Sequence, residues 1–288
     1  MNDVIRQMLA AYGRQRVEDY GRALRDILQQ IALLGLWRVK FFEKAAFYGG
    51  TALRILHGMD RFSEHLDFSL LRPMPGFRLS QYTRGIETEI RSYGFDVQVT
   101  SRPTHPMKPV QSAFLKADTL SHLFLIEAEQ DVLRMVPRGQ VLKIKVEVDT
   151  DPPGEFETET AFLLRPIPFS VRAYSLPDLF AGKMHAVLCR RWKSRVKGRD
   201  WYDFVWYVTH HPELHLAHLE SRMRQTGHLE PEESLTDDLF RIRLSEVIGR
   251  LDVEQARREV EPFVESPASL TAWSRDFFHA IGRRIRIV

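Results

Sequence analysis

The stretch "VLKIKVEVD", residues 141–149, alternates strictly between apolar and charged side chains. This alternation predicts a β-strand, because successive side chains of a strand point to opposite faces of the sheet. One face of the strand is apolar, and the other carries Lys143, Lys145, Glu147 and Asp149. A charged face of this kind indicates either the solvent side of an antiparallel sheet or a strand that lines a charged cleft.

Helical patterns lie on both sides of this strand in the sequence. Apolar side chains recur at helical spacing within residues 1–40. A second helix is predicted to begin at Ser80 and to end before Gly94, and a third follows Ser175. Beyond Pro212 the chain reads as helices joined by short loops.

These patterns predict an α+β fold, with a mixed sheet flanked by helices and a helical C-terminal half. With 288 residues and 44% hydrophobic content, the chain can bury one large core or two smaller ones. We expect an α/β domain with N-terminal helices over residues 1–210 and a helical domain over residues 211–288.

The cysteine content and the hydropathy of the chain indicate the compartment in which the protein is expected. The only cysteine is Cys189, so no internal disulfide can form, and a reducing compartment is expected. No apolar run approaches the length that spans a bilayer, and the first residues are polar and charged, unlike a signal peptide. We therefore expect a soluble, cytoplasmic protein without a membrane partner.

The segment "FYGGTALRILHGMDRFSEHLDFSL", residues 47–70, contains two features that are costly for a simple core. The pair Gly49 and Gly50 costs conformational entropy on folding. Asp67 stands between two apolar residues, where a carboxylate is expensive to bury. A glycine pair that opens a helix can hold phosphate oxygens on backbone amides, and acids from two neighbouring strands can hold Mg²⁺. With Glu147 on the later strand, the pattern is typical of metal-dependent phosphoryl transfer.

Basic residues gather in "CRRWKSRVKGRD", residues 189–200, although the formal net charge of the chain is only +3. Such a cluster suits a polyanion, either a triphosphate or an RNA backbone, and its alternative interpretation is a solvated helix end. The candidate RNA-binding residues are Arg190, Arg191, Lys193, Arg195 and Lys197.

Two further helices carry isolated charges. Lys183 lies on or beside an apolar helix face, so it must either extend outward or meet an anion. Asp200 and Asp203 fall on one side of the next helix, where acids in the first turn also oppose the helix dipole. Arg54 and Arg61 could reach phosphates, but arginines on helices and loops are usually solvated.

At this point the sequence resembles the nucleotidyltransferase toxins of the AbiEii type, within the DNA polymerase β-like nucleotidyltransferase superfamily. The motifs that carry the resemblance follow one another in the family's order and extend from about residue 47 to residue 264. They are "FYGGTALR", "RFSEHLDFSL", "KIKVEV", "SLPDLFAGKMHAVLCRR", "KGRDWYDF" and "VIGRLDVEQARREVEPFV".

The resemblance implies roles for individual residues. The implied nucleotide-binding residues are Gly49, Gly50, Thr51, Arg54, Ser63 and Lys183. Asp67 corresponds to the second acid of the family's Asp-x-Asp pattern and would bind metal, as would Glu147 at the third carboxylate and His65. The implied catalytic residues are Asp67, Lys183, Asp200 and Asp203, where one of the last two is needed for activity.

One position departs from the family pattern. His65 stands where many members have the first acid of Asp-x-Asp, and a neutral imidazole suits Mn²⁺ or Zn²⁺ better than Mg²⁺. Either one metal suffices with Asp67, or Glu64 or another acid substitutes, or His65 transfers a proton, or catalysis has been lost. His57 and His65 lack a zinc-ligand spacing and the other histidines scatter, so no zinc site is expected.

The resemblance implies a metal-dependent nucleotidyltransferase that moves a nucleoside monophosphate from an NTP to an RNA, with tRNA as the leading acceptor. The implied cofactor is Mg²⁺, with Mn²⁺ as a possibility. The family further implies a toxin of a toxin–antitoxin or phage-defence pair, and hence a cognate antitoxin. The alternatives are an enzyme of this fold that modifies a small molecule or a protein, and a catalytically impaired module that binds nucleic acid or a protein partner.

Overall fold

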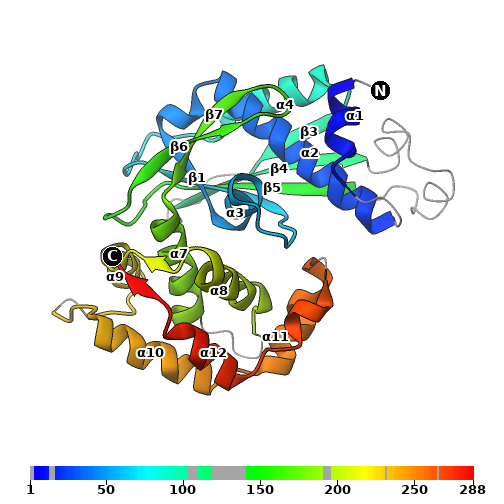
Figure 1. Ribbon diagram of the computed structural model, residues 1–288. Coiled ribbons are helices and arrows are strands. Elements are labelled where there is room, and N and C mark those ends of the chain that lie inside the picture. Colours follow the sequence, from blue (N-terminus) through cyan, green and yellow to red (C-terminus); the bar gives the residue numbers. More distant parts are fainter. Residues whose placement is uncertain are drawn as a thin grey trace. The chain divides into compact units, whose positions relative to one another are not determined.

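The computed structural model describes residues 3–12, 17–102, 109–118, 141–190, 196–230, 232–264 and 266–288. The chain forms two compact units, each built from several stretches of sequence (Figure 1). The sheet unit comprises residues 1–57, 64–152 and 160–173, and the helical unit comprises residues 58–63, 153–159 and 174–288. Within the described part of the chain, no helix combines the length and the apolar character needed to cross a membrane.

The sheet unit contains a mixed seven-stranded sheet in the order β3-β4-β5-β2-β1-β7-β6. Central strand β2 pairs antiparallel with β1 and parallel with β5, and β5 pairs antiparallel with β4. The strands are β1 (Ala45–Tyr48), β2 (His65–Leu70), β3 (Val97–Ser101), β4 (Val110–Asp118), β5 (Val141–Asp149), β6 (Thr158–Leu163) and β7 (Phe169–Tyr174). The last two strands each continue into the helical unit at one end.

Helices α2 (Val17–Arg38) and α4 (Ser80–Ser92) pack against each other, and α2 also contacts β5. Short helix α1 (Asp3–Leu9) contacts α2. The predicted apolar stripe of α2 is confirmed, because Leu24, Ile27, Leu28, Ile31 and Leu34 are all fully buried. Helix α4 begins at Ser80 as predicted, and Gly94 follows it with a φ of +90°, which favours glycine.

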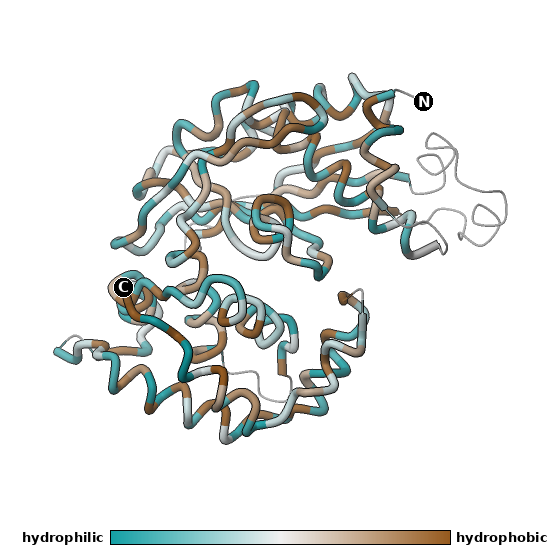
Figure 2. Tube along the Cα trace, viewed as in Figure 1, coloured by the Kyte–Doolittle hydropathy of each residue, from teal (hydrophilic) through white to brown (hydrophobic). Residues whose placement is uncertain are grey.

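The predicted alternation of β5 is confirmed as well. Its apolar side chains Leu142, Ile144, Val146 and Val148 are buried, whereas the charged side chains between them are exposed or half-buried. In the neighbouring strand β2, Leu66, Phe68 and Leu70 are fully buried, whereas His65 is exposed and Asp67 is half-buried. Apolar residues recur along the elements of both units with polar residues between them (Figure 2). The opposite face of β2 and β5 is therefore the polar face of the sheet.

The helical unit surrounds a second aromatic core. Phe278 of α12 contacts Trp201 and Phe204 of α8, with ring centroids 4.9 Å and 6.2 Å away, and Trp273 at 5.3 Å. The elements are α7 (Leu176–Cys189), α8 (Gly198–His210), β8 (Glu213–Leu214), α9 (Leu216–Gln225), α10 (Asp237–Gly249), α11 (Val253–Val260), α12 (Arg275–Gly282) and β9 (Arg286–Ile287).

The division into units differs from the expected boundary at residue 210. Helices α7 and α8 belong to the helical unit together with the C-terminal helices, because α8 packs against α11 and α12, and α7 packs against α8, α9 and α10. The sequence shows that these two helices follow the strands, but it does not indicate whether they pack against the sheet or against the C-terminal helices. The unit also takes in the short stretch of residues 58–63.

The tight packing of α8 on α11 gives a stability prediction. A Cβ atom on Gly198 would lie 1.9 Å from the backbone oxygen of Ala256, whereas one on Gly21 in α2 would meet nothing within 4 Å. We expect Gly198→Ala to destabilise the protein by about 3 kcal/mol, since the clash involves rigid backbone. Gly21→Ala is expected to stabilise it by about 0.5–1 kcal/mol through helix propensity. Thermal unfolding of both variants tests this, and equal unfolding temperatures would contradict the described packing.

Candidate active site

The turn between β1 and helix α3 (Gly49–His57) brings the backbone of Gly49 close to the carboxylate of Asp67. Gly49 has a φ of +83°, which side chains other than glycine rarely adopt. A Cβ atom at this position would lie 2.8 Å from Oδ2 of Asp67. The glycine is therefore required both for the direction of the turn and for the space that the Asp67 carboxylate occupies.

Strand register places a cluster of three side chains on the polar face of the sheet. Asp67 of β2 lies opposite Tyr48 of β1 and beside Glu147 of β5. His65 precedes Asp67 by two residues on the same face of β2. One ligand atom from each of His65, Asp67 and Glu147 lies within 4.8 Å of the others. The structure thus brings together the three residues predicted to bind metal.

Electrostatic contacts surround Glu147. Lys145 places its Nζ 2.6 Å from Oε1, and His65 places its Nδ1 3.9 Å from Oε2. The His65 side chain is 47% exposed and that of Glu147 is 25% exposed, so the cluster remains accessible to a solute. An ammonium group therefore contacts one oxygen of this carboxylate, and an imidazole lies near the other.

The donor set fits a divalent cation. Two carboxylates, from Asp67 and Glu147, are the oxygen ligands that Mg²⁺ and Mn²⁺ prefer. The imidazole of His65 fits Mn²⁺ better than Mg²⁺. The close approach at Gly49 also brings the first turn of α3 to the carboxylate, and helix N-termini favour phosphate oxygens.

Three residues expected near the triphosphate are largely buried and contact other parts of the protein or lie in the helical unit. They are Thr51, Arg54 and Ser63. The hydroxyl of Thr51, which is fully buried, donates to the backbone oxygen of His65 and so ties α3 to β2. Arg54 donates to Asp26 of α2 at 2.8 Å, and its side chain is only 12% exposed. Ser63 is buried and belongs to the helical unit.

A buried carboxylate organises the helical unit. Asp203 of α8 is fully buried and accepts two hydrogen bonds from Arg61, at 2.6 Å from Nε and 2.7 Å from Nη2. Lys183 of α7 lies 2.6 Å from Oδ2 of the same carboxylate. The two predicted residues Lys183 and Asp203 therefore meet directly, and Arg61 joins them.

The charge of Asp203 is fixed by these partners. Burial raises the pKa of its carboxyl, but the positive charges and hydrogen bonds of Arg61 and Lys183 outweigh burial and lower the pKa to about 2. The carboxylate is thus ionised at neutral pH and holds the Lys183 ammonium in one place. Tyr207, fully buried one turn further along α8, has its pKa raised by burial and by Asp203.

The interpretation of Arg61 as a solvated side chain is wrong. Its side chain is only 4% exposed, and its bidentate partner lies 142 residues away in the sequence. Arg61 begins the motif "RFSEHLDFSL", which marks it as a candidate functional residue, but no spacing in the sequence connects it with Asp203. The pairing of Arg61 with Asp203 is seen only in the three-dimensional structure.

Asp200, the second acid of α8, has a different environment. Nη1 of Arg190 lies 3.0 Å from Oδ2 of Asp200, and the Arg190 side chain is 43% exposed. Burial and the nearby cations Arg190 and Lys183 lower the pKa of Lys197 to about 8, although Asp200 raises it. Arg191, Lys193 and Arg195 lie outside the described residues.

The sheet unit thus carries an acidic cluster beside a glycine turn, an arrangement that can hold a divalent cation and phosphate oxygens. A family model described as "Nucleotidyl transferase AbiEii toxin, Type IV TA system" matches residues 31–279. Because the match spans most of the chain, the protein belongs to this family of type IV toxin–antitoxin nucleotidyltransferases. Membership implies an NTP as substrate and an antitoxin as partner.

Solved structures that a structural comparison matches to this chain share little sequence with it. A candidate nucleotidyltransferase from Helicobacter pylori is 16% identical, with 92% of each chain covered and a TM-score of 0.49. The protein JHP933 from Helicobacter pylori is 15% identical over 91% of this chain and 88% of its own, also with a TM-score of 0.49. A comparison with curated proteins gives no match.

The buried triad predicts a specific pH dependence of stability. The pKa of Asp203 is depressed from 3.8 to about 2, so its contribution is present above pH 4 and is lost as the pH falls toward 2. This shift corresponds to about 2 kcal/mol of unfolding free energy. We expect Asp203→Asn to remove this part of the pH dependence and to destabilise the protein at neutral pH by about 3–5 kcal/mol, because Arg61 and Lys183 lose their counter-charge.

Urea unfolding at several pH values measures this difference. Asp238→Asn, at an exposed position in the first turn of α10, is the matched control and should follow the wild-type pH profile. If Asp203→Asn kept the wild-type pH dependence between pH 4 and pH 2, the ionised buried carboxylate would be disproved.

Proposed function

We propose that the protein is a metal-dependent nucleotidyltransferase that transfers a nucleoside monophosphate from an NTP to an RNA, with tRNA as the favoured acceptor. The observation that carries the proposal is the cluster of His65, Asp67 and Glu147, whose ligand atoms lie within 4.8 Å of one another beside the start of α3. Family membership supports the reaction class, and the cluster supports its dependence on metal.

In this reaction an oxygen of an acceptor hydroxyl attacks the α-phosphorus of the NTP. A new phosphodiester bond forms, the bond from the α-phosphorus to the bridging oxygen breaks, and pyrophosphate leaves while the hydroxyl proton is released. A bound divalent cation supplies neutralisation of phosphate charge and a lower pKa of the hydroxyl. The protein contributes mainly positioning and electrostatic stabilisation.

The sheet unit is proposed to hold the metal and part of the triphosphate. Asp67 and Glu147 are the proposed oxygen ligands, and His65 is the proposed third ligand. The positive φ of Gly49 presents the first turn of α3 toward the Asp67 carboxylate, where backbone amides can donate to phosphate oxygens. Gly50 is proposed to contribute there, and Thr51 to hold α3 against β2 through its bond to His65.

Lys183 is proposed to donate to phosphate oxygens of the nucleotide. An ammonium group has three N–H donors, and Asp203 accepts from it at 2.6 Å. The Lys183 side chain is 14% exposed, and Asp203 holds it in one orientation together with Arg61. In this proposal Asp203 is a positioning residue and Lys183 is the residue that contacts substrate.

The basic segment that contains Arg190 and Lys197 is proposed to attract the RNA backbone. Arg190 is partly exposed although it pairs with Asp200, and Lys197 is largely protonated at neutral pH with a pKa of about 8. Arg191, Lys193 and Arg195 are proposed to add to the same charge. We further propose a role of the toxin in phage defence, which membership in a type IV toxin–antitoxin family supports.

Label transfer is the direct test of the reaction. Purified protein is incubated with each α-labelled NTP, Mg²⁺ or Mn²⁺ and total RNA. We expect label in a tRNA-sized band, and we expect Asp67→Asn and Glu147→Gln to reduce its formation by about a hundredfold or more, since each variant removes a charge at the metal site.

The matched control is Asp96→Asn in the same unit, because the Asp96 side chain is 95% exposed. Label in a protein band instead of RNA would replace the proposed acceptor with a protein. Activity that survives Asp67→Asn would overturn the site. Absence of transfer with every NTP and metal, in folded protein, would favour the catalytically impaired binding module.

The identity of the third ligand predicts a metal preference. Because His65 presents imidazole nitrogen where oxygen suits Mg²⁺, we expect wild-type label transfer to be faster with Mn²⁺ than with Mg²⁺. His65→Asp should raise the rate with Mg²⁺ and lower the ratio of the Mn²⁺ rate to the Mg²⁺ rate. His65→Ala controls for loss of the imidazole without a new carboxylate. An unchanged ratio in His65→Asp would show that His65 is not a metal ligand.

A further inference from the structure

We propose that the helical unit contains a second metal site, in which His185, Cys189 and His228 bind a borderline-soft divalent cation of the Zn²⁺ class. One ligand atom of each residue lies within 4.8 Å of the others. All three residues belong to the helical unit, whereas His65, Asp67 and Glu147 belong to the sheet unit. The proposed site is therefore separate from the proposed catalytic cluster.

Two of the ligands come from one face of α7. His185 and Cys189 are four residues apart in this helix, so their side chains lie one turn apart on the same side. Cys189 is the last residue of α7 and is buried. This pair supplies an imidazole and a sulfur atom from a rigid element, which favours a defined geometry.

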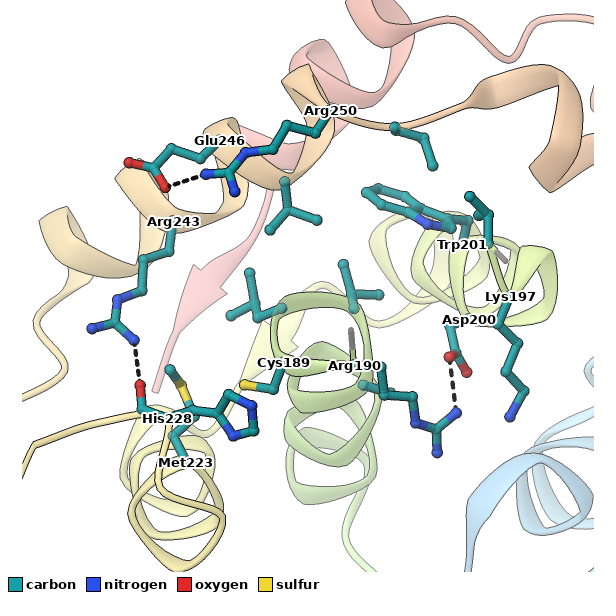
Figure 3. Close-up of a pocket in the computed structure, with 16 residues that line it drawn as sticks. Cys189, Arg190, Lys197, Asp200, Trp201, Met223, His228, Arg243, Glu246 and Arg250 are labelled. Atoms are coloured by element: carbon teal, nitrogen blue, oxygen red, sulfur yellow. Dashed lines mark hydrogen bonds and ion pairs between the residues drawn. The ribbon is translucent and has the colours of Figure 1, made fainter. Parts of the chain in front are cut away.

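The third ligand is positioned by the turn after α9. The backbone N–H of His228 donates to the Met223 oxygen at 2.8 Å, and Gly227 has a φ of +68° that allows the chain to reverse. Nη1 of Arg243, from α10, donates to the backbone oxygen of His228 at 2.8 Å. These bonds fix the backbone of His228 and direct its ring toward α7 (Figure 3).

A hydroxyl links the two imidazoles. Oγ1 of Thr226 lies 2.8 Å from Nε2 of His185 and 2.9 Å from Nδ1 of His228. The two rings are 6.0 Å apart and nearly perpendicular. Because each imidazole has a second nitrogen, the Thr226 hydroxyl can orient both rings while the other nitrogens face a cation, as outer hydrogen bonds do at metal sites.

The ligand chemistry selects the ion. A sulfur atom and two imidazoles suit Zn²⁺, which is commonly held by cysteine and histidine in tetrahedral geometry, and they do not suit Mg²⁺ or Ca²⁺.

The proposed site has an access path. Cys189 and His228 line a cavity of about 570 Å³ in the helical unit, together with Met223 and Arg243. In the close-up of this cavity, the sulfur of Cys189 and the ring of His228 point toward each other (Figure 3). A cation that enters this cavity can therefore reach Cys189 and His228.

The expectation of no zinc site was based on spacing in the sequence. His185 and Cys189 form a short pair, but the third ligand lies far along the chain and meets them only after α7 and α9 pack together. A bound ion would connect α7 with the turn after α9, and we infer a structural role in holding these elements together.

Cobalt binding tests the proposal directly. Untagged, chelator-treated protein is titrated with Co²⁺ while the thiolate-to-cobalt charge-transfer band and the visible bands of tetrahedral Co²⁺ are recorded. The charge-transfer band can arise only from Cys189, the single cysteine of the chain. We expect the charge-transfer band to report one Co²⁺ bound at Cys189, apart from any Co²⁺ at the proposed catalytic cluster, and we expect Zn²⁺ to abolish the band by displacement.

The variants separate the site from unspecific binding. We expect Cys189→Ser to abolish the charge-transfer band, and His185→Ala and His228→Ala to weaken binding by at least about tenfold. His211→Ala, at an exposed position outside the cluster, should keep the wild-type charge-transfer band and its Co²⁺ affinity. Circular dichroism establishes folding of each variant. Absence of the band in folded wild type, or unchanged affinity in both histidine variants, would overturn the proposal.

Discussion

The contact between the Asp67 carboxylate and the backbone of Gly49 is the constraint on which the candidate active site depends. It requires a residue without a Cβ atom, a positive φ at that residue, and a register of β1 and β2 that places Tyr48 opposite Asp67. A slip of one residue in β2 would turn Asp67 to the buried face and Phe68 to the polar face. The buried apolar side chains of β2 thus also protect the position of the carboxylate.

In the helical unit, the main electrostatic constraint is the burial of a charged carboxylate. A fully buried carboxylate is costly, and Asp203 is tolerated because Arg61 and Lys183 supply charge and hydrogen bonds together. Replacement of all three by apolar residues could be as stable, so stability alone does not explain the triad. Its specific effect is to fix the ammonium group of Lys183 within the unit, which is the property that a residue acting on phosphates requires.

Sequence patterns predict those parts of the molecule that depend on local order. The alternation of β5, the stripe of α2 and the helix that begins at Ser80 follow from periodicity and end signals, and the structure confirms them. The residues of the proposed metal cluster follow from motifs that strand pairing then brings together. Residue periodicity contains no information about which distant elements share a core, so the membership of α7 and α8 in the helical unit did not follow from it.

The same limit applies to single side chains. Arg61 has no neighbour in the sequence that would indicate burial, and its partner is found only through tertiary structure. Similarly, Cys189 and the histidines near it form a cluster only after the turn at Gly227 returns the chain to α7. Residue types and motifs in the sequence indicate candidate functional residues, but the tertiary packing determines which residues they contact.

The short stretch of residues 58–63 belongs to the helical unit although both of its flanks belong to the sheet unit. During synthesis from the N-terminus, Arg61 therefore leaves the ribosome 142 residues before Asp203. The nascent chain cannot complete the helical unit until the greater part of the protein has been made, and such long-range closure slows folding. A translation product that ends before Asp203 lacks the carboxylate that contacts Arg61 and Lys183, so the buried triad cannot form in it.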